Sequence, residues 1–225
     1  MSADFSEVHE RANSRAIVSS LPQHGPYTLG LKRLFDVCCV LLSLPFVLPL
    51  VAILAFLVKR DGGPAFYTQE RVGRGGRIYK IWKLRTMVVN ADAALKDYLA
   101  SNPEAAAEWA LTQKLKKDPR ITKTGWILRK SSFDELPQLF NVLVGHMSLV
   151  GPRPMMPEQV DMYPGRAYYF ERPGITGTWQ VSQRNQSSFA DRARFDTEYV
   201  ANLSFSNDVK LLFATVRVVL NGTGY

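Results

Sequence analysis

The apolar positions of the chain form one long uninterrupted run near the N-terminus. Residues 37–58 read VCCVLLSLPFVLPLVAILAFLV and carry no formal charge. As a straight helix, a segment of this length measures about 33 Å, which just matches the hydrocarbon core of a bilayer. We therefore expect a membrane-associated helix here, and the buried core helix of a soluble protein is the less favoured alternative.

Two features of this run favour a re-entrant helix over a spanning one. Pro45 and Pro49 lie near its middle, and each removes a backbone donor and crowds the preceding turn, so we expect a bend. A single span usually carries its Lys and Arg on the cytoplasmic side, but here basic residues flank both ends, at Lys32, Arg33, Lys59 and Arg60. A helix that bends back is slightly favoured over a kinked span.

The next segment alternates apolar and polar positions, with the period of a β-strand. Residues 65–87 do so around a glycine-rich turn at 73–76, which predicts a β-hairpin. The second arm carries basic residues that we expect to form a row on one face, namely Lys80, Lys83 and Arg85.

The remaining pattern is mainly helical. Residues 90–117 are rich in Ala, Leu, Glu and Lys, and Asn-Pro at 102–103 indicates a break between two helices. A loop is expected at 118–125. The apolar run 208–220 predicts a C-terminal helix that either lies in the membrane interface or packs as an ordinary helix.

The amino-acid composition makes the chain strongly basic. The formal net charge is +8 and the pI is about 9.6, so we expect an anionic partner: nucleic acid, an anionic membrane surface or a phosphorylated substrate. Cys38 and Cys39 are neighbours and cannot easily bridge each other, so we expect buried thiols in a reducing compartment. No secretory signal is visible in residues 1–30.

Candidate chemistry lies in the stretch SSFDELP, residues 131–137. Pro137 fits the first turn of a helix, so we expect a helix to begin between Ser132 and Glu135, with Ser or Asp as the cap. The helix dipole would then hold Asp134 and Glu135 ionised. Because consecutive helical residues point about 100° apart, one carboxylate can face a substrate while the other holds a metal ion. Simple N-terminal capping is the alternative interpretation.

Three arginines favour the chemical interpretation. Arg129 precedes Asp134 by five positions, Arg153 stands between two prolines, and Arg184 follows the glycine-punctuated stretch 173–177. The planar fork of arginine suits phosphate. Arginines around an ionised carboxylate pair suit a diphosphate that Mg²⁺ bridges to the acids.

Several long motifs, in one order, carry a resemblance to a known family. They read KRLFD, FYTQERVGRGGRIYKIWKLRTM, LRKSSFDELPQLFNVLVGHMSLVGPRP, RPGITGTWQVSQRN and FDTEYVANLSFSNDVKLLFATVRVVL. Over residues 32–220 the sequence resembles the bacterial sugar transferases of the monotopic phosphoglycosyl transferase family. Within it, the sequence is most similar to the undecaprenyl-phosphate galactose phosphotransferases of exopolysaccharide synthesis.

The resemblance implies a reaction and a set of site residues. A hexose-1-phosphate, expected to be galactose-1-phosphate, would move from a UDP-hexose to undecaprenyl phosphate, with release of UMP. Asp134 would attack the β-phosphorus and form a covalent phosphosugar intermediate, and Glu135 would help to hold Mg²⁺. The resemblance implies that Arg129, Arg153 and Arg184 bind phosphates or nucleotide, and that Lys83 and Arg85 line the site.

The resemblance also implies a location and a fold. The family's re-entrant helix breaks at a Ser-Pro pair, where this sequence has Leu48-Pro49, so Pro45 is expected to share the bend with Pro49. Both ends of the chain would face the cytoplasm at the bacterial inner membrane. We expect a mainly α protein with a small β-hairpin (α+β), monotopic in the membrane, with an N-terminal re-entrant helix and interfacial amphipathic helices.

The expected domain division is a mobile leader at 1–30, the re-entrant helix at 31–60 and a cytosolic or interfacial catalytic domain at 61–225. Expected partners are UDP-hexose, undecaprenyl phosphate and inner-membrane lipids, without nucleic acid; a homodimer and downstream glycosyltransferases are further candidates.

Three alternatives stay open at this point. The first is the same reaction with UDP-glucose or an N-acetylated hexose, and the second is a membrane-attached phosphohydrolase with an aspartyl-phosphate intermediate. The third is a membrane-anchored basic module that binds anionic lipid or nucleic acid. Only this last alternative predicts that Asp134→Ala leaves function intact.

Overall fold

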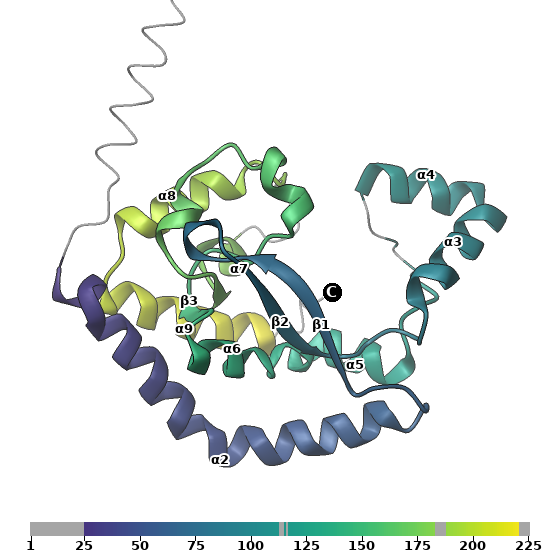
Figure 1. The fold of residues 1–225 in the computed structure, drawn as a ribbon, viewed down its shortest axis with the longest axis horizontal. Coiled ribbons are helices and arrows are strands. Elements are labelled where there is room, and N and C mark those ends of the chain that lie inside the picture. Colours follow the sequence, from purple (N-terminus) through teal and green to yellow (C-terminus); the bar gives the residue numbers. More distant parts are fainter. Residues whose placement is uncertain (1–24, 113–114, 116, 183–187, 221–225) are drawn as a thin grey trace, which may run out of the picture. The chain divides into compact units, whose positions relative to one another are not determined.

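The computed structural model describes residues 25–112, 115, 117–182 and 188–220, and Figure 1 shows their helices and strands. By their contacts they form two units. Unit 1 is taken from Met1–Ser43, Gln69–Ile81 and Gln138–Val218, and unit 2 from Leu44–Thr68, Trp82–Pro137 and Val219–Tyr225. The division predicted at residues 30 and 60 stays a prediction, and residues 1–24 of the expected leader lie outside the described residues.

The apolar run forms helix α2 (Lys32–Lys59), which follows a short π-helical turn at Tyr27–Leu31. Only 6% of its most apolar window is buried, which contradicts the alternative of a core helix. The helix is long and apolar enough to cross a membrane. Pro45 and Pro49 both lie inside it, and the boundary between the units falls just before Pro45. The choice between a re-entrant and a spanning helix stays a prediction.

The two cysteines correct one expectation. Cys38 is exposed and Cys39 is partly exposed, and both are free thiols. The expected burial is wrong because they lie on a helix that the other described residues leave largely uncovered.

The predicted hairpin is confirmed. Strands β1 (Phe66–Val72) and β2 (Ile78–Leu84) pair in a two-stranded sheet. A short 3-10 turn at Arg74–Gly76 joins them, and Gly75 and Gly76 adopt φ values of 66° and 80°. Residues with a side chain rarely take these values, so the glycines make the tight turn accessible.

One part of the hairpin prediction is wrong. Side chains alternate between the faces of a strand, so Lys80 shares the face of Ile78 and Trp82, all three of them exposed. Lys83 belongs to the opposite face of β2. The expected single basic row therefore does not include Lys80.

The helices of unit 2 follow the predicted order. α3 (Ala91–Ser101) and α4 (Pro103–Thr112) are separated at Asn102, as predicted. α5 (Lys123–Ser131) begins within the stretch expected to be a loop, because the Thr122 hydroxyl caps it by accepting from the backbone N–H of Gly125 at 2.9 Å.

The core of unit 2 holds the end of α2 against β2 and α5. Val58, Leu84 and Leu128 are buried together, and Leu54 and Ala55 pack on them. A Cβ atom on Gly125 would lie 1.9 Å from the carbonyl oxygen of Thr86. The close approach of α5 to the chain after β2 therefore requires glycine at this position.

Unit 1 contains a second sheet that the sequence pattern did not predict. β3 (Ser148–Val150) and β4 (Gly174–Thr176) pair in parallel, with Ser148 opposite Gly174 and Val150 opposite Thr176. Around them lie the 3-10 turns Pro157–Met162 and Ala167–Phe170 and four helices: α6 (Gln138–Val144), α7 (Thr178–Ser182), α8 (Arg192–Ala201) and α9 (Phe205–Leu220).

Helix α9 has one packed face and one open face. Asp208 and Leu211 are buried in unit 1, whereas Phe213 and Val216 are 74% and 56% exposed. The packed-helix interpretation therefore holds for the first face. The second face is free to lie against a membrane interface, which stays a prediction.

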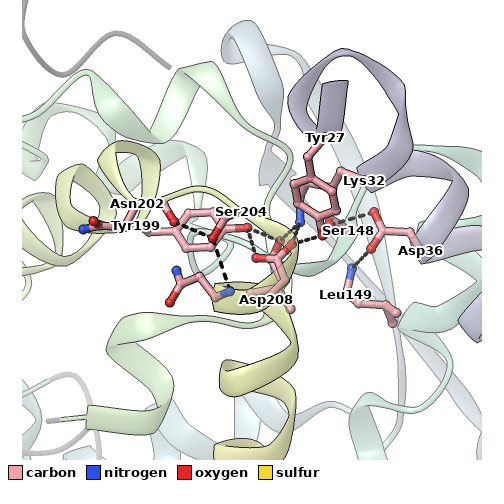
Figure 2. A network of polar contacts seen from close by, with 11 residues as sticks. Tyr27, Lys32, Asp36, Ser148, Leu149, Tyr199, Asn202, Ser204 and Asp208 are labelled. Carbon is pink, nitrogen blue, oxygen red and sulfur yellow. Dashed lines mark hydrogen bonds and ion pairs between the residues drawn. The ribbon is translucent and has the colours of Figure 1, made fainter. Parts of the chain in front are cut away.

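A buried polar network ties the start of α2 to the rest of unit 1 (Figure 2). The Lys32 ammonium lies 2.5 Å from Oδ2 of Asp208 and 3.0 Å from the Val150 carbonyl oxygen. The hydroxyls of Tyr27 and Tyr199 donate to the same carboxylate at 2.7 and 2.9 Å. Asp36, one turn after Lys32, accepts from β3.

Candidate active site

A tight turn positions the two adjacent carboxylates. Helix α5 ends at Ser131, and Ser132 adopts a left-handed conformation with φ of 59°. This backbone conformation is uncommon outside glycine, and such residues cluster at functional sites. A 3-10 turn at Phe133–Glu135 follows, so Asp134 and Glu135 lie in a regular turn directly after the end of α5.

The helix predicted to start between Ser132 and Glu135 begins later. Glu135 and Leu136 donate to carbonyls three residues back, at 3.2 and 3.3 Å, which makes this turn 3-10 rather than α. Pro137 has no N–H, and α6 begins only at Gln138. The Ser132 side chain does not cap the turn, so the capping interpretation is wrong for that residue.

The end of β2 brings a cation to the carboxylates. The Lys83 ammonium lies 2.7 Å from Oε1 of Glu135 and 3.7 Å from Oδ2 of Asp134. Asp134 is 8% exposed. The three side chains therefore form one partly buried cluster in unit 2, built from segments about 50 residues apart in the chain.

Burial controls the charge state of Asp134. Loss of water raises the pKa of this carboxyl, and the neighbouring charge of Glu135 raises it further, while Lys83 and Arg129 oppose the rise. The expectation that a helix end keeps Asp134 readily ionised is therefore not supported. A poorly hydrated carboxylate that is held beside a cation is well placed to act as a nucleophile.

Arg129 lies in the last turn of α5 and belongs to the same cluster. Its Nε donates to the Thr86 hydroxyl at 2.9 Å. Burial lowers the pKa of the Arg129 guanidinium, and the charge of Asp134 raises it. Thr86 orients this arginine, and sequence reasoning missed it because an isolated threonine after a strand carries no pattern.

Arg85 is placed differently from the other candidates. Its guanidinium pairs with Asp61 and donates to the carbonyl oxygens of Pro64, Met87 and Val58, at 2.7, 2.9 and 3.2 Å. These contacts tie the end of α2 to the strand that carries Lys83. We therefore assign Arg85 as a positioning residue, although the sequence suggested that it lines the site.

Replacing Arg85 with Lys is expected to destabilise unit 2 by about 2–4 kcal/mol, since each lost hydrogen bond contributes about 0.5–1.5 kcal/mol and lysine cannot reproduce the planar fork. The measurement is the free energy of unfolding in detergent. Arg60→Lys, at an exposed neighbouring position, is the matched control. Equal stability of the two variants would contradict the assignment.

Two of the predicted arginines remain. Arg153 belongs to unit 1, where its guanidinium carbon lies 5.6 Å from the ring centroid of Trp179. Arg184 lies outside the described residues. The structure thus brings together Lys83, Arg129, Asp134 and Glu135, and it describes Arg153 as part of another unit.

The donor set around Glu135 fits Mg²⁺. Among the residues that the structure describes, no three or more His, Cys, Asp or Glu side chains gather as a protein-only metal cage. Mg²⁺ is usually bound by one or two carboxylates together with substrate phosphates and water. Two carboxylates that converge on the positive charge of Lys83 meet that requirement.

Known proteins are similar to this sequence over most of its length. The bacterial sugar transferase family matches residues 27–222. The undecaprenyl-phosphate galactose phosphotransferase of Salmonella typhimurium is 48% identical and the UDP-galactose-lipid carrier transferase of Erwinia amylovora 50% identical, over 86% of this chain and 41% of each relative. The exopolysaccharide production protein ExoY of Sinorhizobium fredii is 45% identical over 86% of this chain and 87% of its own length.

The chain therefore spans about two fifths of the first two relatives and most of the third. The range matched by the family includes α2, the hairpin, the carboxylate cluster and α9. The chain belongs to the bacterial sugar transferase family.

Proposed function

We propose that this protein transfers a hexose-1-phosphate from a UDP-hexose to undecaprenyl phosphate, with release of UMP, as the first step of exopolysaccharide synthesis. The observation that carries the proposal is the buried Asp134 beside Glu135 and the Lys83 ammonium. Galactose is the expected hexose, because two relatives are named for galactose transfer. UDP-glucose is the alternative donor.

The carboxylate cluster suits a two-step transfer. An oxygen of Asp134 attacks the β-phosphorus of the donor, and the bond from that phosphorus to the bridging oxygen breaks, which releases UMP. A phosphate oxygen of the lipid then attacks the same phosphorus, and the bond to Asp134 breaks. A carboxylate nucleophile thereby divides one transfer between two bulky substrates into two steps at one site.

The cationic side chains stabilise the charge that moves during both steps. Lys83 contacts both carboxylates, and Arg129, held by Thr86, carries a charge that interacts with that of Asp134. Fixed positive groups of this kind lower the barrier for phosphoryl transfer. Glu135 would hold Mg²⁺, which when bound neutralises charge on the phosphoryl oxygens. Arg153 and Arg184 are proposed to bind phosphates or nucleotide.

The apolar helix supports a location of this chemistry at a membrane. Helix α2 would attach the protein to the cytoplasmic face of the bacterial inner membrane as a re-entrant helix that bends at Pro45 and Pro49. The open face of α9 would lie in the interface, because its exposed Phe213 and Val216 are apolar. A homodimer and downstream glycosyltransferases are further proposed partners.

A release assay tests the proposed function. Detergent-extracted protein is incubated with Mg²⁺ and a panel of UDP-sugars, with and without undecaprenyl phosphate, and UMP and lipid-linked product are followed. We expect repeated turnover only with lipid, fastest with UDP-galactose, and loss of turnover when Mg²⁺ is chelated. Continuous UMP release without lipid, together with free sugar phosphate, would instead establish a phosphohydrolase.

A further inference from the structure

Two arginines converge on one tryptophan in unit 1. Trp179 of α7 is buried, and the guanidinium carbon of Arg192 lies 4.3 Å from its ring centroid. Arg153, in the loop after β3, lies 5.6 Å from the same ring. The ring of Phe189 also contacts Arg192, at 4.6 Å. Aromatic rings thus fix the position of Arg192 on helix α8.

The positive charge of Arg192 is poorly compensated by the chain. Its Nε is buried and has no hydrogen-bond partner. Burial lowers the pKa of its guanidinium to about 10, and the like charge of Arg153 is the next cause. Among the described residues, no ion pair involves Arg192. Two guanidinium groups over one buried ring repel each other, and an anion bound between them would relieve this repulsion.

The nearest carboxyl group does not supply that anion. Asp196, one turn further along α8, accepts a hydrogen bond from the Tyr163 hydroxyl at 2.8 Å. Burial raises the pKa of Asp196 to about 7, against the opposing effect of Arg192. Burial therefore weakens the compensation that this carboxyl gives to the charge of Arg192.

The residue after Trp179 is a second polar group without a partner. Gln180 is 7% exposed, and neither its amide nitrogen nor its amide oxygen has a hydrogen-bond partner. Buried side-chain amides are normally satisfied by protein or water. The segment around α7 thus combines the poorly compensated guanidinium of Arg192 with an amide that has unfilled hydrogen-bonding capacity.

We propose that Arg192 and Arg153, held on Trp179, bind the phosphate group of a phosphorylated ligand. A stacked guanidinium keeps the N–H groups on its edge available, and this fork matches the oxygen spacing of a phosphate. The phosphate belongs to the nucleotide donor or to the lipid acceptor, and this choice of sources rests on the proposed function. The role of Arg192 extends the set of arginines that the sequence motifs suggested.

The test measures binding to the full-length protein in nanodiscs, in an Asp134→Asn background that prevents turnover. The probes are UMP, inorganic phosphate and undecaprenyl phosphate incorporated into the discs. Arg192→Met, which retains the apolar stem, is expected to weaken binding of at least one probe tenfold or more. Selective loss of UMP binding identifies the nucleotide as the source, and selective loss of undecaprenyl phosphate binding identifies the lipid.

Arg194→Met is the matched control, because this arginine on the same helix is exposed and stacks on Phe195 at 4.5 Å; it is expected to bind every probe normally. Arg192→Lys retains the charge without the fork and should weaken binding at least threefold, so it tests the proposal where Arg192→Met fails to fold. Unchanged affinities in the Arg192 variants, or no binding of any probe to the parent protein, would overturn the proposal.

The outcomes are separable from those of the release assay. Binding that depends on Arg192 in a protein that transfers no sugar would retain the phosphate site and reject the proposed reaction. Normal transfer, with probe binding that is indifferent to Arg192, would reject the phosphate site and retain the reaction.

Discussion

Replacing Asp134 with Asn is expected to lower the rate of lipid-linked product formation by at least about a thousandfold, as loss of a catalytic nucleophile does in other enzymes. Asparagine has nearly the same shape as aspartate and fits a position that is 8% exposed. Its amide lacks the charge and the nucleophilicity needed to form a bond to phosphorus. The measurement is the initial rate with UDP-galactose and undecaprenyl phosphate.

The covalent intermediate provides a second readout. Without lipid, the unmodified protein should release about one UMP per active site and retain labelled sugar phosphate on Asp134, whereas Asp134→Asn should do neither. Asp97→Asn is the matched control, because Asp97 is exposed on α3. If Asp134→Asn retained a tenth of the activity of the unmodified protein, the assignment of Asp134 as the nucleophile would be contradicted.

The sequence predicted those parts of the fold that rest on local patterns. The seven-residue strands β1 and β2 alternate clearly enough to be found, and Pro103 marks the break between α3 and α4. Strands β3 and β4 have three residues each, too few to show a period. Their pairing depends on contacts between distant segments, which no local pattern contains.

The same distinction applies to the candidate site. Asp134, Glu135 and Arg129 are near one another in sequence and could be proposed together. The contact of Lys83 with Glu135 joins residues 52 positions apart, and only the folded chain reveals it. The sequence also does not show which group a basic side chain contacts. Arg85 was therefore expected at the site, although it binds Asp61 and backbone carbonyls.

Replacing Asp208 with Asn is expected to destabilise unit 1 by about 3–5 kcal/mol, the usual effect of removing one partner of a buried ion pair. Asp208 is fully buried, and the Lys32 ammonium would lose the carboxylate that it pairs with and keep neutral oxygens, such as the Val150 carbonyl, as hydrogen-bond acceptors. The hydroxyls of Tyr27 and Tyr199 would lose a charged acceptor at the same time. Urea unfolding in detergent, followed by tryptophan fluorescence, measures the change.

A double-mutant cycle separates the pair from its surroundings. Lys32→Met leaves a buried carboxylate without its counter-charge and should cost a similar amount, whereas the double variant Lys32→Met with Asp208→Asn should lose clearly less than the sum. Lys210→Met, an exposed lysine two residues after Asp208 on α9, should change stability by less than about 0.5 kcal/mol. Additive losses at Lys32 and Asp208 would contradict the coupling.

The expected coupling also explains why an ion pair stands at this position. A hydrophobic replacement of similar size is often as stable as a buried pair. Apolar side chains can pack against each other in several helix rotations and registers, whereas a buried charge requires its partner in one position. Lys32 is the first residue of α2, and Asp36, one turn later, accepts hydrogen bonds from β3. Together they fix the rotation of the first turns of the apolar helix against β3 and α9. We therefore expect the double variant to be more stable than the sum of the two single losses implies, but to show faster hydrogen exchange at the amides of residues 32–36 than the unmodified protein.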